Sequence, residues 1–279
     1  MEPARLTSTS SDRVKALQAL HDRAGRRKAG RFLVEGPQAV RAALSASSGA
    51  GVVVREIFAD DDAGSAFADV MQAASAAGVP VVPVTDRVLA AMAETAQPQG
   101  VLAVCDLLTP PALSDVLGAH GPVVVLDAVS DPGNVGTVVR TAAAVGAAGV
   151  LLTPGSADIH NGKVVRSTAG ALFRLPVLPG VTVDELADGA RDAGRQIVVT
   201  AGDGATDLFA AVGAGAVGDR TCWVIGSEAH GVGAQTRAAA DLAVRIPMAP
   251  GPESLNAAVA AAVVLYVTRY ALSGPTQPG

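Results

Sequence analysis

Three short segments of the 279-residue chain combine glycine with polar side chains directly after an apolar run. They are residues 127–140 (DAVSDPGNVGTVVR), 223–231 (WVIGSEAHG) and 246–259 (IPMAPGPESLNAAV). In α/β proteins ligands bind beyond the carboxyl ends of strands, and glycine there lets the backbone approach a ligand closely. These segments are therefore the first candidates for functional sites.

Five polar residues stand out within these segments. We expect Asn134 to cap a helix, whose free N–H groups make an anion site, with Arg140 about a turn and a half further along. Glu228 places a negative charge in a glycine-rich turn. Ser254 can cap the C-terminal helix, while Asn256 at its apolar start needs a buried partner or faces a site. Taken singly, each residue also fits an ordinary cap or a solvated side chain.

Other chemistry-bearing patterns fail in their context. The glycines 213, 215 and 218 match G-x-G-x-x-G, but an apolar strand follows them instead of preceding them, so a flexible loop is favoured over a dinucleotide site. No G-x-S-x-G nucleophile motif occurs. Four scattered histidines supply no zinc ligand set, so no metal is expected. Cys105 and Cys222 lie in apolar runs and are predicted to be buried, reduced thiols.

Charge is distributed unevenly along the chain. The net charge is −5, yet the first 31 residues carry eight basic and three acidic side chains, or +5, which leaves −10 for the remainder. Such asymmetry is typical of a chain that meets a polyanion at one end, although a solvated basic helix explains it as well. Aromatic residues are only 3%, which disfavours a protein that stacks single-stranded bases on aromatic platforms.

The elements that must position these residues alternate between short β-branched runs and alanine-rich helical stretches, which predicts an α/β fold in two domains. The first part, a small αβα sandwich, has expected strands at 32–35, 52–59, 79–84 and 101–106 and helices at 37–44, 67–77 and 86–93. The second has expected strands at 123–126, 150–152, 197–200, 222–225 and 244–246 and helices at 136–145, 184–193, 235–240 and about 255–272.

We therefore predict a domain at 1–107, a linker at 108–121 and a second domain with a largely parallel sheet at 122–279. The last helix is apolar on most of its circumference and must be buried in the core or against a second subunit. No apolar run reaches the ~18 to 20 residues of a membrane span, and the start carries no export signal. A cytoplasmic protein without membrane contact is expected.

In this order, DPGNVGTVVR, IGSEAHG and IPM with ESLNAAVA resemble the three signature motifs of the SpoU (TrmH-like) branch of the SPOUT RNA methyltransferases, over about residues 122–270. Two shorter pieces, RRKAGRFLVEG at 26–36 and QGVLAV at 99–104, resemble the substrate-binding domain of that family, which is similar in fold to a ribosomal protein of the L30e type. In this sequence Ser227 stands where the second motif often has Asn.

The resemblance implies a C-terminal SPOUT domain with a deep trefoil knot, an L30e-like αβα domain before it, and a homodimer. It implies S-adenosylmethionine as cofactor and methyl transfer to a ribose 2′-hydroxyl. The implied catalytic residues are Arg140, Asn134, Glu228, Ser254 and Asn256. The implied cofactor residues are Thr200, Ala201, Gly202, Ile225, Gly226, Gly231, Ile246, Met248, Ser254, Leu255 and Ala257. The expected RNA-binding residues are Arg26, Arg27, Lys28, Arg31 and Arg140.

The N-terminal domain favours ribosomal RNA of the 23S type as substrate, because tRNA-modifying members of the family are often short. A tRNA 2′-O-methyltransferase and a noncatalytic RNA-binding assembly factor with the same fold remain alternatives. An arginine base is physically unfavourable, since the guanidinium pKa lies above ~12. We expect Arg140 to hold a phosphate and stabilise a developing alkoxide instead.

Overall fold

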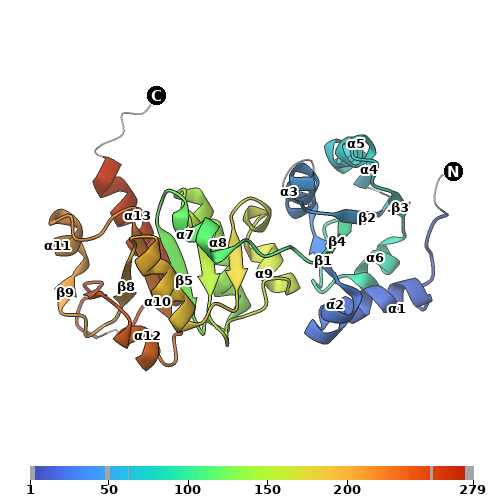
Figure 1. Ribbon diagram of the computed structural model, residues 1–279. Coiled ribbons are helices and arrows are strands. Elements are labelled where there is room, and N and C mark those ends of the chain that lie inside the picture. The colour runs from blue at the N-terminus through green and yellow to red at the C-terminus, as the bar shows by residue number, and fades with distance from the viewer. Residues whose placement is uncertain (1–3, 48–50, 62, 252–253, 274–279) are drawn as a thin grey trace. The chain divides into compact units, whose positions relative to one another are not determined.

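The computed structural model describes residues 4–47, 51–61, 63–251 and 254–273, and the chain divides into two compact units (Figure 1). Unit 1 comprises Met1–Thr109 and Asp158–Arg174, and unit 2 comprises Pro110–Ala157 and Leu175–Gly279. The segment Asp158–Arg174, placed in the second domain by the sequence analysis, thus groups with unit 1. Its side chains are anchored there by ion pairs to Arg26 and Glu35. Pro252 and Glu253 of the third motif lie outside the described residues.

Unit 1 is built on a four-stranded mixed sheet in the order β1-β4-β2-β3, with α1 and α6 on one face and α3 and α5 on the other (Figure 1). Alternation along the strands explains both layers, because Leu33, Phe58 and Leu102 face α1 and α6 while the intervening residues face α3. The predicted αβα sandwich is confirmed. The strands are β1 (Arg31–Glu35), β2 (Val54–Ala59), β3 (Val81–Pro83) and β4 (Val101–Asp106). The helices are α1 (Asp12–Gln18), η1 (Ala19–His21), α2 (Arg23–Ala29), α3 (Pro37–Ser47), α4 (Ala63–Ala66), α5 (Ala68–Ala76), α6 (Asp86–Met92), α9 (Gly162–Ser167) and η2 (Ala171–Phe173).

Unit 2 contains a seven-stranded sheet in the order β7-β6-β5-β10-β8-β11-β9, in which every pairing is parallel. The largely parallel sheet expected from the continuous apolar runs is confirmed. The strands are β5 (Val123–Asp127), β6 (Gly149–Leu152), β7 (Val177–Pro179), β8 (Gln196–Thr200), β9 (Thr206–Asp207), β10 (Thr221–Gly226) and β11 (Leu242–Arg245). Because these strands are parallel, the carboxyl ends of neighbours β8, β10 and β11 meet at one edge of the sheet.

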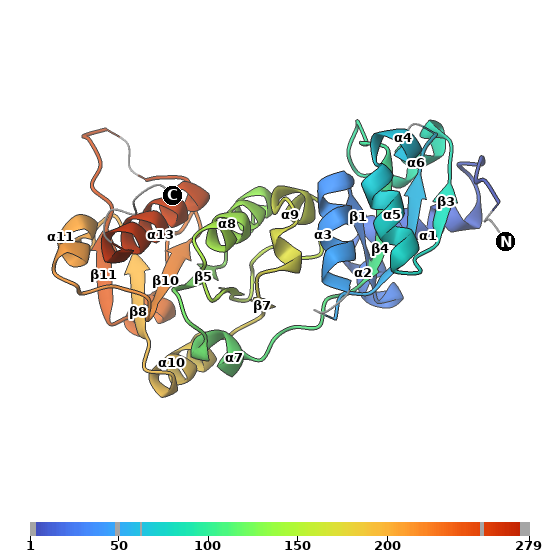
Figure 2. The same cartoon turned by 90° about the horizontal axis from the view of Figure 1, so that it is seen from above.

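Helices cover both faces of this sheet (Figure 2). Val125, Leu151 and Val224 pack toward α7 and α10, and the opposite face lies under α8 and α13. Within the part of the chain that the structure describes, no helix is long and apolar enough to cross a membrane. The helices are α7 (Leu113–Gly118), α8 (Pro132–Ala144), α10 (Val183–Asp192), α11 (Leu208–Gly213), α12 (Ala234–Ala238) and α13 (Ala257–Ser273).

The predicted linker at 108–121 contains a helix, α7, that its prolines and glycines concealed. This helix is tied into unit 2 by Arg195, a buried side chain whose guanidinium donates hydrogen bonds to the carbonyls of Leu117, Ala119 and Gly121. Burial lowers the pKa of Arg195 below its usual value. Arg195 lies 74 or more positions away in the sequence from the carbonyls that it holds. The local composition of this turn-rich stretch therefore did not reveal the helix.

Candidate active site

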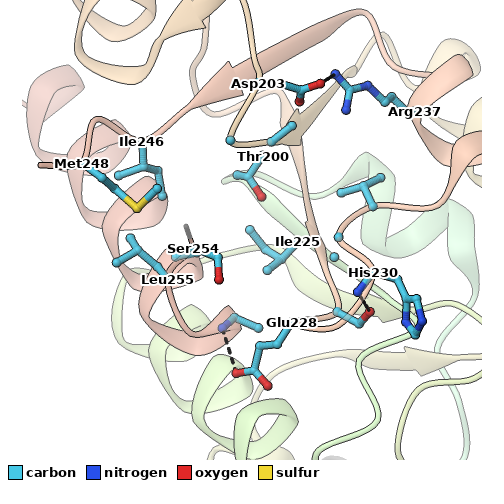
Figure 3. Close-up of a pocket in the computed structure, with 18 residues that line it drawn as sticks. Thr200, Asp203, Ile225, Glu228, His230, Arg237, Ile246, Met248, Ser254 and Leu255 are labelled. Carbon is cyan, nitrogen blue, oxygen red and sulfur yellow. Dashed lines mark hydrogen bonds and ion pairs between the residues drawn. The ribbon is translucent and has the colours of Figure 1, made fainter. Parts of the chain in front are cut away.

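A cavity of about 280 Å³ lies at the carboxyl ends of β8, β10 and β11, where α13 begins (Figure 3). Its size is close to the lower end of the ~300–1,000 Å³ found for small-molecule sites. The structure brings all eleven residues predicted to bind the cofactor into its lining. These are Thr200, Ala201, Gly202, Ile225, Gly226, Gly231, Ile246, Met248, Ser254, Leu255 and Ala257.

Two charged residues of the lining were missed by the sequence analysis. Asp203 follows the predicted stretch 200–202, and its Oδ2 lies 2.9 Å from Nη2 of Arg237 in the last turn of α12 (Figure 3). The hydrogen bond from Arg237 lowers the pKa of Asp203. Both residues are exposed, and 34 positions separate them, so the pair becomes visible only in the folded structure. His230 is exposed and also lines the cavity.

The loop after β10 closes on itself and forms one wall of the cavity. Ser227 and Gly231 exchange two backbone hydrogen bonds of 3.1 and 2.8 Å, with Gly231 at φ +64°, a conformation that favours glycine. A Cβ atom on Gly226 would lie 2.1 Å from the carbonyl carbon of Gly231. Gly226 is therefore required for the loop to approach the strand, which explains the glycine that the motif places there.

Glu228 connects the three sequence motifs. Its Oε1 accepts a hydrogen bond of 2.9 Å from Nδ2 of Asn134, a second from Nδ2 of Asn256 and a third of 3.3 Å from the backbone N–H of Ala257. Asn256 Nδ2 also donates to Oδ1 of Asn134 at 3.0 Å. Four of the predicted catalytic side chains, Glu228, Asn134, Asn256 and Ser254, therefore lie at or beside the cavity, and three of them form one hydrogen-bond network.

Two helix caps differ from the expectation. Helix α8 is capped by Asp131, whose Oδ1 accepts from the backbone N–H of Asn134, so the predicted Asn134 cap is wrong. The Pro-Gly pair after Asp131 belongs to the first turn, since proline fits the first helical position, and Asn134 is free to turn its amide toward Glu228. At α13 the cap is Asn256, which accepts from the N–H groups of Ala258 and Val259.

Arg140 is an exposed side chain on α8, about a turn and a half beyond Asn134, and it is not part of the cavity lining. It has no ion-pair or hydrogen-bond partner among the residues that the structure describes. A guanidinium group presented to solvent in this way is available to a ligand that comes from outside the chain.

The basic segment divides into one buried and several exposed residues. Arg26 is only 3% exposed, and its guanidinium donates to Asp158 at 2.8 and 3.2 Å and to the carbonyls of Leu20 and His21. The prediction that Arg26 binds RNA is therefore corrected, because its donors are already used inside unit 1. Arg27, Lys28 and Arg31 are exposed, and Arg31 makes only a loose ion pair of 3.8 Å with Asp106.

Both cysteines are buried and free, as predicted. Burial raises the pKa of the Cys105 thiol, in unit 1, and of the Cys222 thiol, in unit 2, to about 12. Neither thiol is a nucleophile at neutral pH.

Comparisons with known proteins agree with this geometry. Residues 121–266 match the model of the SpoU rRNA Methylase family, and residues 11–103 match the MRM3-like substrate binding domain. The 23S rRNA (guanosine(2553)-2'-O)-methyltransferase RlmP of Bacillus subtilis is 32% identical over 95% of this chain and 99% of its own length.

Two solved structures are also similar. The AdoMet-bound rRNA methyltransferase from Sinorhizobium meliloti superposes with a TM-score of 0.82 at 28% identity, covering 95% of this chain and 97% of that one. The SpoU methyltransferase AviRb from Streptomyces viridochromogenes, in complex with AdoMet, gives 0.78 at 29% identity, covering 93% and 97%. With its three motifs converging on one cavity and both parts of its sequence matched, the chain belongs to the SpoU rRNA methylase family.

Proposed function

We propose that this protein is an S-adenosylmethionine-dependent RNA methyltransferase that acts on a ribose 2′-hydroxyl of 23S-type ribosomal RNA. The observation that carries this proposal is the network of Asn134, Glu228 and Asn256, which ties all three motifs together beside a cavity suited to a small molecule. The name of RlmP from Bacillus subtilis, a 23S rRNA (guanosine(2553)-2'-O)-methyltransferase, supports the same substrate.

The cavity fits S-adenosylmethionine in its chemistry. Ile225, Ile246 and Leu255 offer apolar walls for a flat adenine, while backbone groups at the strand ends offer hydrogen bonds. The carboxylates of Glu228 and Asp203 face a cavity that would receive a cationic ligand. When bound, the cofactor supplies an electrophilic methyl group on its sulfonium.

Glu228 and its partners position groups around the reacting centre. Three donors on Oε1 fix the carboxylate, and its Oε2 has no hydrogen-bond partner among the described residues, so this oxygen can accept from a ribose hydroxyl. Asn256 is in turn fixed at the N-terminus of α13 by two backbone donors. Such a preorganised network is what aligned displacement requires, because poor alignment of the reacting atoms costs rate.

Arg140 acts on the RNA. A guanidinium group offers hydrogen-bond donors and no acceptor, so it is a poor base for the 2′-hydroxyl proton. It can hold the phosphate next to the target ribose and stabilise negative charge as the O–H bond breaks. In a dimer, this exposed arginine can serve the cavity of its own chain or that of the partner.

Replacing Arg140 with alanine tests the assignment. We expect the rate of methyl transfer to fall by at least about a hundredfold, on the scale of losing one charge-stabilising donor, while the dissociation constant for S-adenosylmethionine stays within about twofold of wild type. Calorimetric titration and incorporation of labelled methyl groups measure the two quantities. Arg191→Ala, which removes an exposed arginine of unit 2, is the matched control. Unchanged turnover in Arg140→Ala would contradict the assigned role.

A homodimer and a deep trefoil knot belong to the same proposal. Helix α13 exposes apolar side chains at Val259 (48%), Tyr266 (42%) and Tyr270 (56%), which supports a second subunit on this face. Sedimentation should give about twice the 27.7 kDa chain mass. If the chain is knotted, pulling on its two ends should leave a chain shorter than 279 fully extended residues.

Electrostatic attraction brings RNA to unit 1. The exposed side chains of Arg27, Lys28 and Arg31 supply sequence-independent phosphate contacts, which should weaken as salt is raised. A protein with this substrate works where ribosomal RNA is made and assembled, which in a bacterium is the cytoplasm.

A further inference from the structure

Unit 1 holds a second cavity, of about 290 Å³, that the methyl-transfer chemistry does not use. The two N-terminal motifs singled out in the sequence meet there, since Glu35 and Gly36 end the first and Gln99 begins the second. Gly36 has a φ of +88°, and a Cβ atom on it would lie 2.8 Å from Oε1 of Gln99. The absence of a side chain at Gly36 leaves the space that Gln99 borders.

An ion cluster forms the base of this cavity. The buried carboxylate of Glu35 accepts from Nη1 of Arg166 at 3.1 Å and from the backbone N–H groups of Glu94 and Thr95 at 2.9 and 3.4 Å. The Oε2 atom of Glu94 lies 3.5 Å from the same Nη1 atom. The guanidinium of Arg166 is thus fixed in place by two carboxylates, and part of it remains accessible.

Uncharged amides form the walls. Gln38, Gln97 and Gln99 are exposed, line the cavity and have no hydrogen-bond partner among the described residues. Each amide offers donors and an acceptor side by side. Such a group can make paired hydrogen bonds to a nucleobase edge, where donors and acceptors also alternate.

The charges decide which part of an RNA the cavity can take. Glu35 and Glu94 carry two negative charges against the single positive charge of Arg166, so the cluster has a net charge of −1 and disfavours a phosphate. An uncharged base avoids this repulsion, can use the amides, and can lie against the planar guanidinium, as unpaired RNA bases do on arginine. We propose that this cavity binds one unpaired nucleobase of the RNA substrate, and this inference rests on the proposed function.

The double variant Gln97→Ala/Gln99→Ala tests the site without disturbing buried groups. Its dissociation constant for an in vitro transcript of 23S ribosomal RNA should rise about tenfold, on the scale of one lost base contact. Its affinity for S-adenosylmethionine and its kcat at saturating RNA should not change. Gln72→Ala, which removes an exposed glutamine from α5 in the same unit, is the matched control and should bind RNA like wild type.

A second measurement identifies the ligand as a base. Transcripts that carry one abasic nucleotide at successive unpaired positions should include one position that weakens wild type about tenfold but leaves the double variant unaffected. RNA binding by the double variant equal to that of wild type, or an equal effect of every abasic position on both proteins, would overturn the inference. If wild type transfers no methyl group to any RNA, the proposed function fails instead, and the binding results still stand separately.

Discussion

The cavity described above in unit 1 and the one in unit 2 are nearly equal in volume, at about 290 and 280 Å³, but different kinds of group line them. The cavity in unit 2 is built mainly from strand ends, glycines and apolar side chains, and its charged residues Asp203, Glu228 and Arg237 stand at its border. The cavity in unit 1 consists of glutamine amides above a buried ion cluster. The first therefore depends on the path of the backbone, and the second depends on individual side chains and on their charges. Substitutions should affect the two in different ways.

The largest effect is expected when one methyl group is added to the backbone that lines the cavity of unit 2. In Gly226→Ala the new Cβ would lie 2.1 Å from the backbone of Gly231, a distance that forces the loop away from the strand. We expect S-adenosylmethionine affinity to fall by at least about a hundredfold, because the loop that forms the cavity wall cannot close. Calorimetry measures this affinity.

Gly213→Ala is the control for this change, since a Cβ there meets nothing within 4 Å. It should bind the cofactor like wild type. Normal cofactor affinity in Gly226→Ala would show that the loop tolerates displacement and that the cavity is not backbone-limited.

An intermediate effect is expected for the ion pair that anchors Asp158–Arg174 in unit 1. Asp158→Asn leaves the guanidinium of Arg26 buried without its counter-charge, which should cost unit 1 about 3 kcal/mol of unfolding free energy at pH 7. Asp69→Asn, which breaks the exposed pair with Arg41 in the same unit, should cost less than about 1 kcal/mol. Urea unfolding followed by labelling of Cys105 reports on unit 1.

The pH dependence of the Arg26–Asp158 pair follows from the direction in which the fold shifts the pKa of Asp158. Burial alone would raise the pKa of Asp158, but hydrogen bonds from His160 and Arg26 outweigh it and hold the pKa below its usual value. The pKa of an aspartate in the unfolded chain is about 3.9, so above this pH the ionised Asp158 stabilises the fold. This contribution to the unfolding free energy is lost as the pH falls below that value. Wild type should therefore lose more stability between pH 6 and pH 3 than Asp158→Asn does. Equal losses would show that the pair does not anchor the segment.

The smallest effect is expected in the rates at which the two units open locally. Each unit buries one cysteine whose pKa is raised to about 12, so a thiol reagent at pH 8 reacts only after local opening. A tenfold excess of S-adenosylmethionine over its dissociation constant should slow labelling of Cys222 about tenfold and leave Cys105 unchanged. Equal slowing at both cysteines would mean that the units do not open independently.

Much of the fold was predictable because it follows from local patterns. Continuous apolar runs such as that of β5 identify buried parallel strands, and alanine-rich stretches between them identify helices. Helix α7 was not predictable, since its stability comes from Arg195, which is distant in the sequence. The start of α8 was misplaced because Asn134 and Asp131 are both good caps, and only the fold shows which side chain turns toward Glu228.

The candidate site was predictable to the extent that it lies on contiguous motifs. Residues such as Gly226 and Leu255 could be named because the motifs that contain them resemble those of a known family, and the resemblance implies their roles. Arg237 could not, since its place in the lining and its pairing with Asp203, 34 positions away, appear only in the folded structure. The burial of Arg26 could not be predicted either. A basic residue in a basic run gives no sign that it will pair with Asp158, which is 132 positions away.

A map of ribose methylation in total RNA, from cells with and without this protein, tests the central claim most directly. One nucleotide of the 23S ribosomal RNA should lose its 2′-O-methyl group when the protein is absent, and purified protein with S-adenosylmethionine should restore it. An Arg140→Ala protein should fail to restore it. A lost mark in tRNA with ribosomal RNA unchanged, or an unchanged map, would contradict the proposed function.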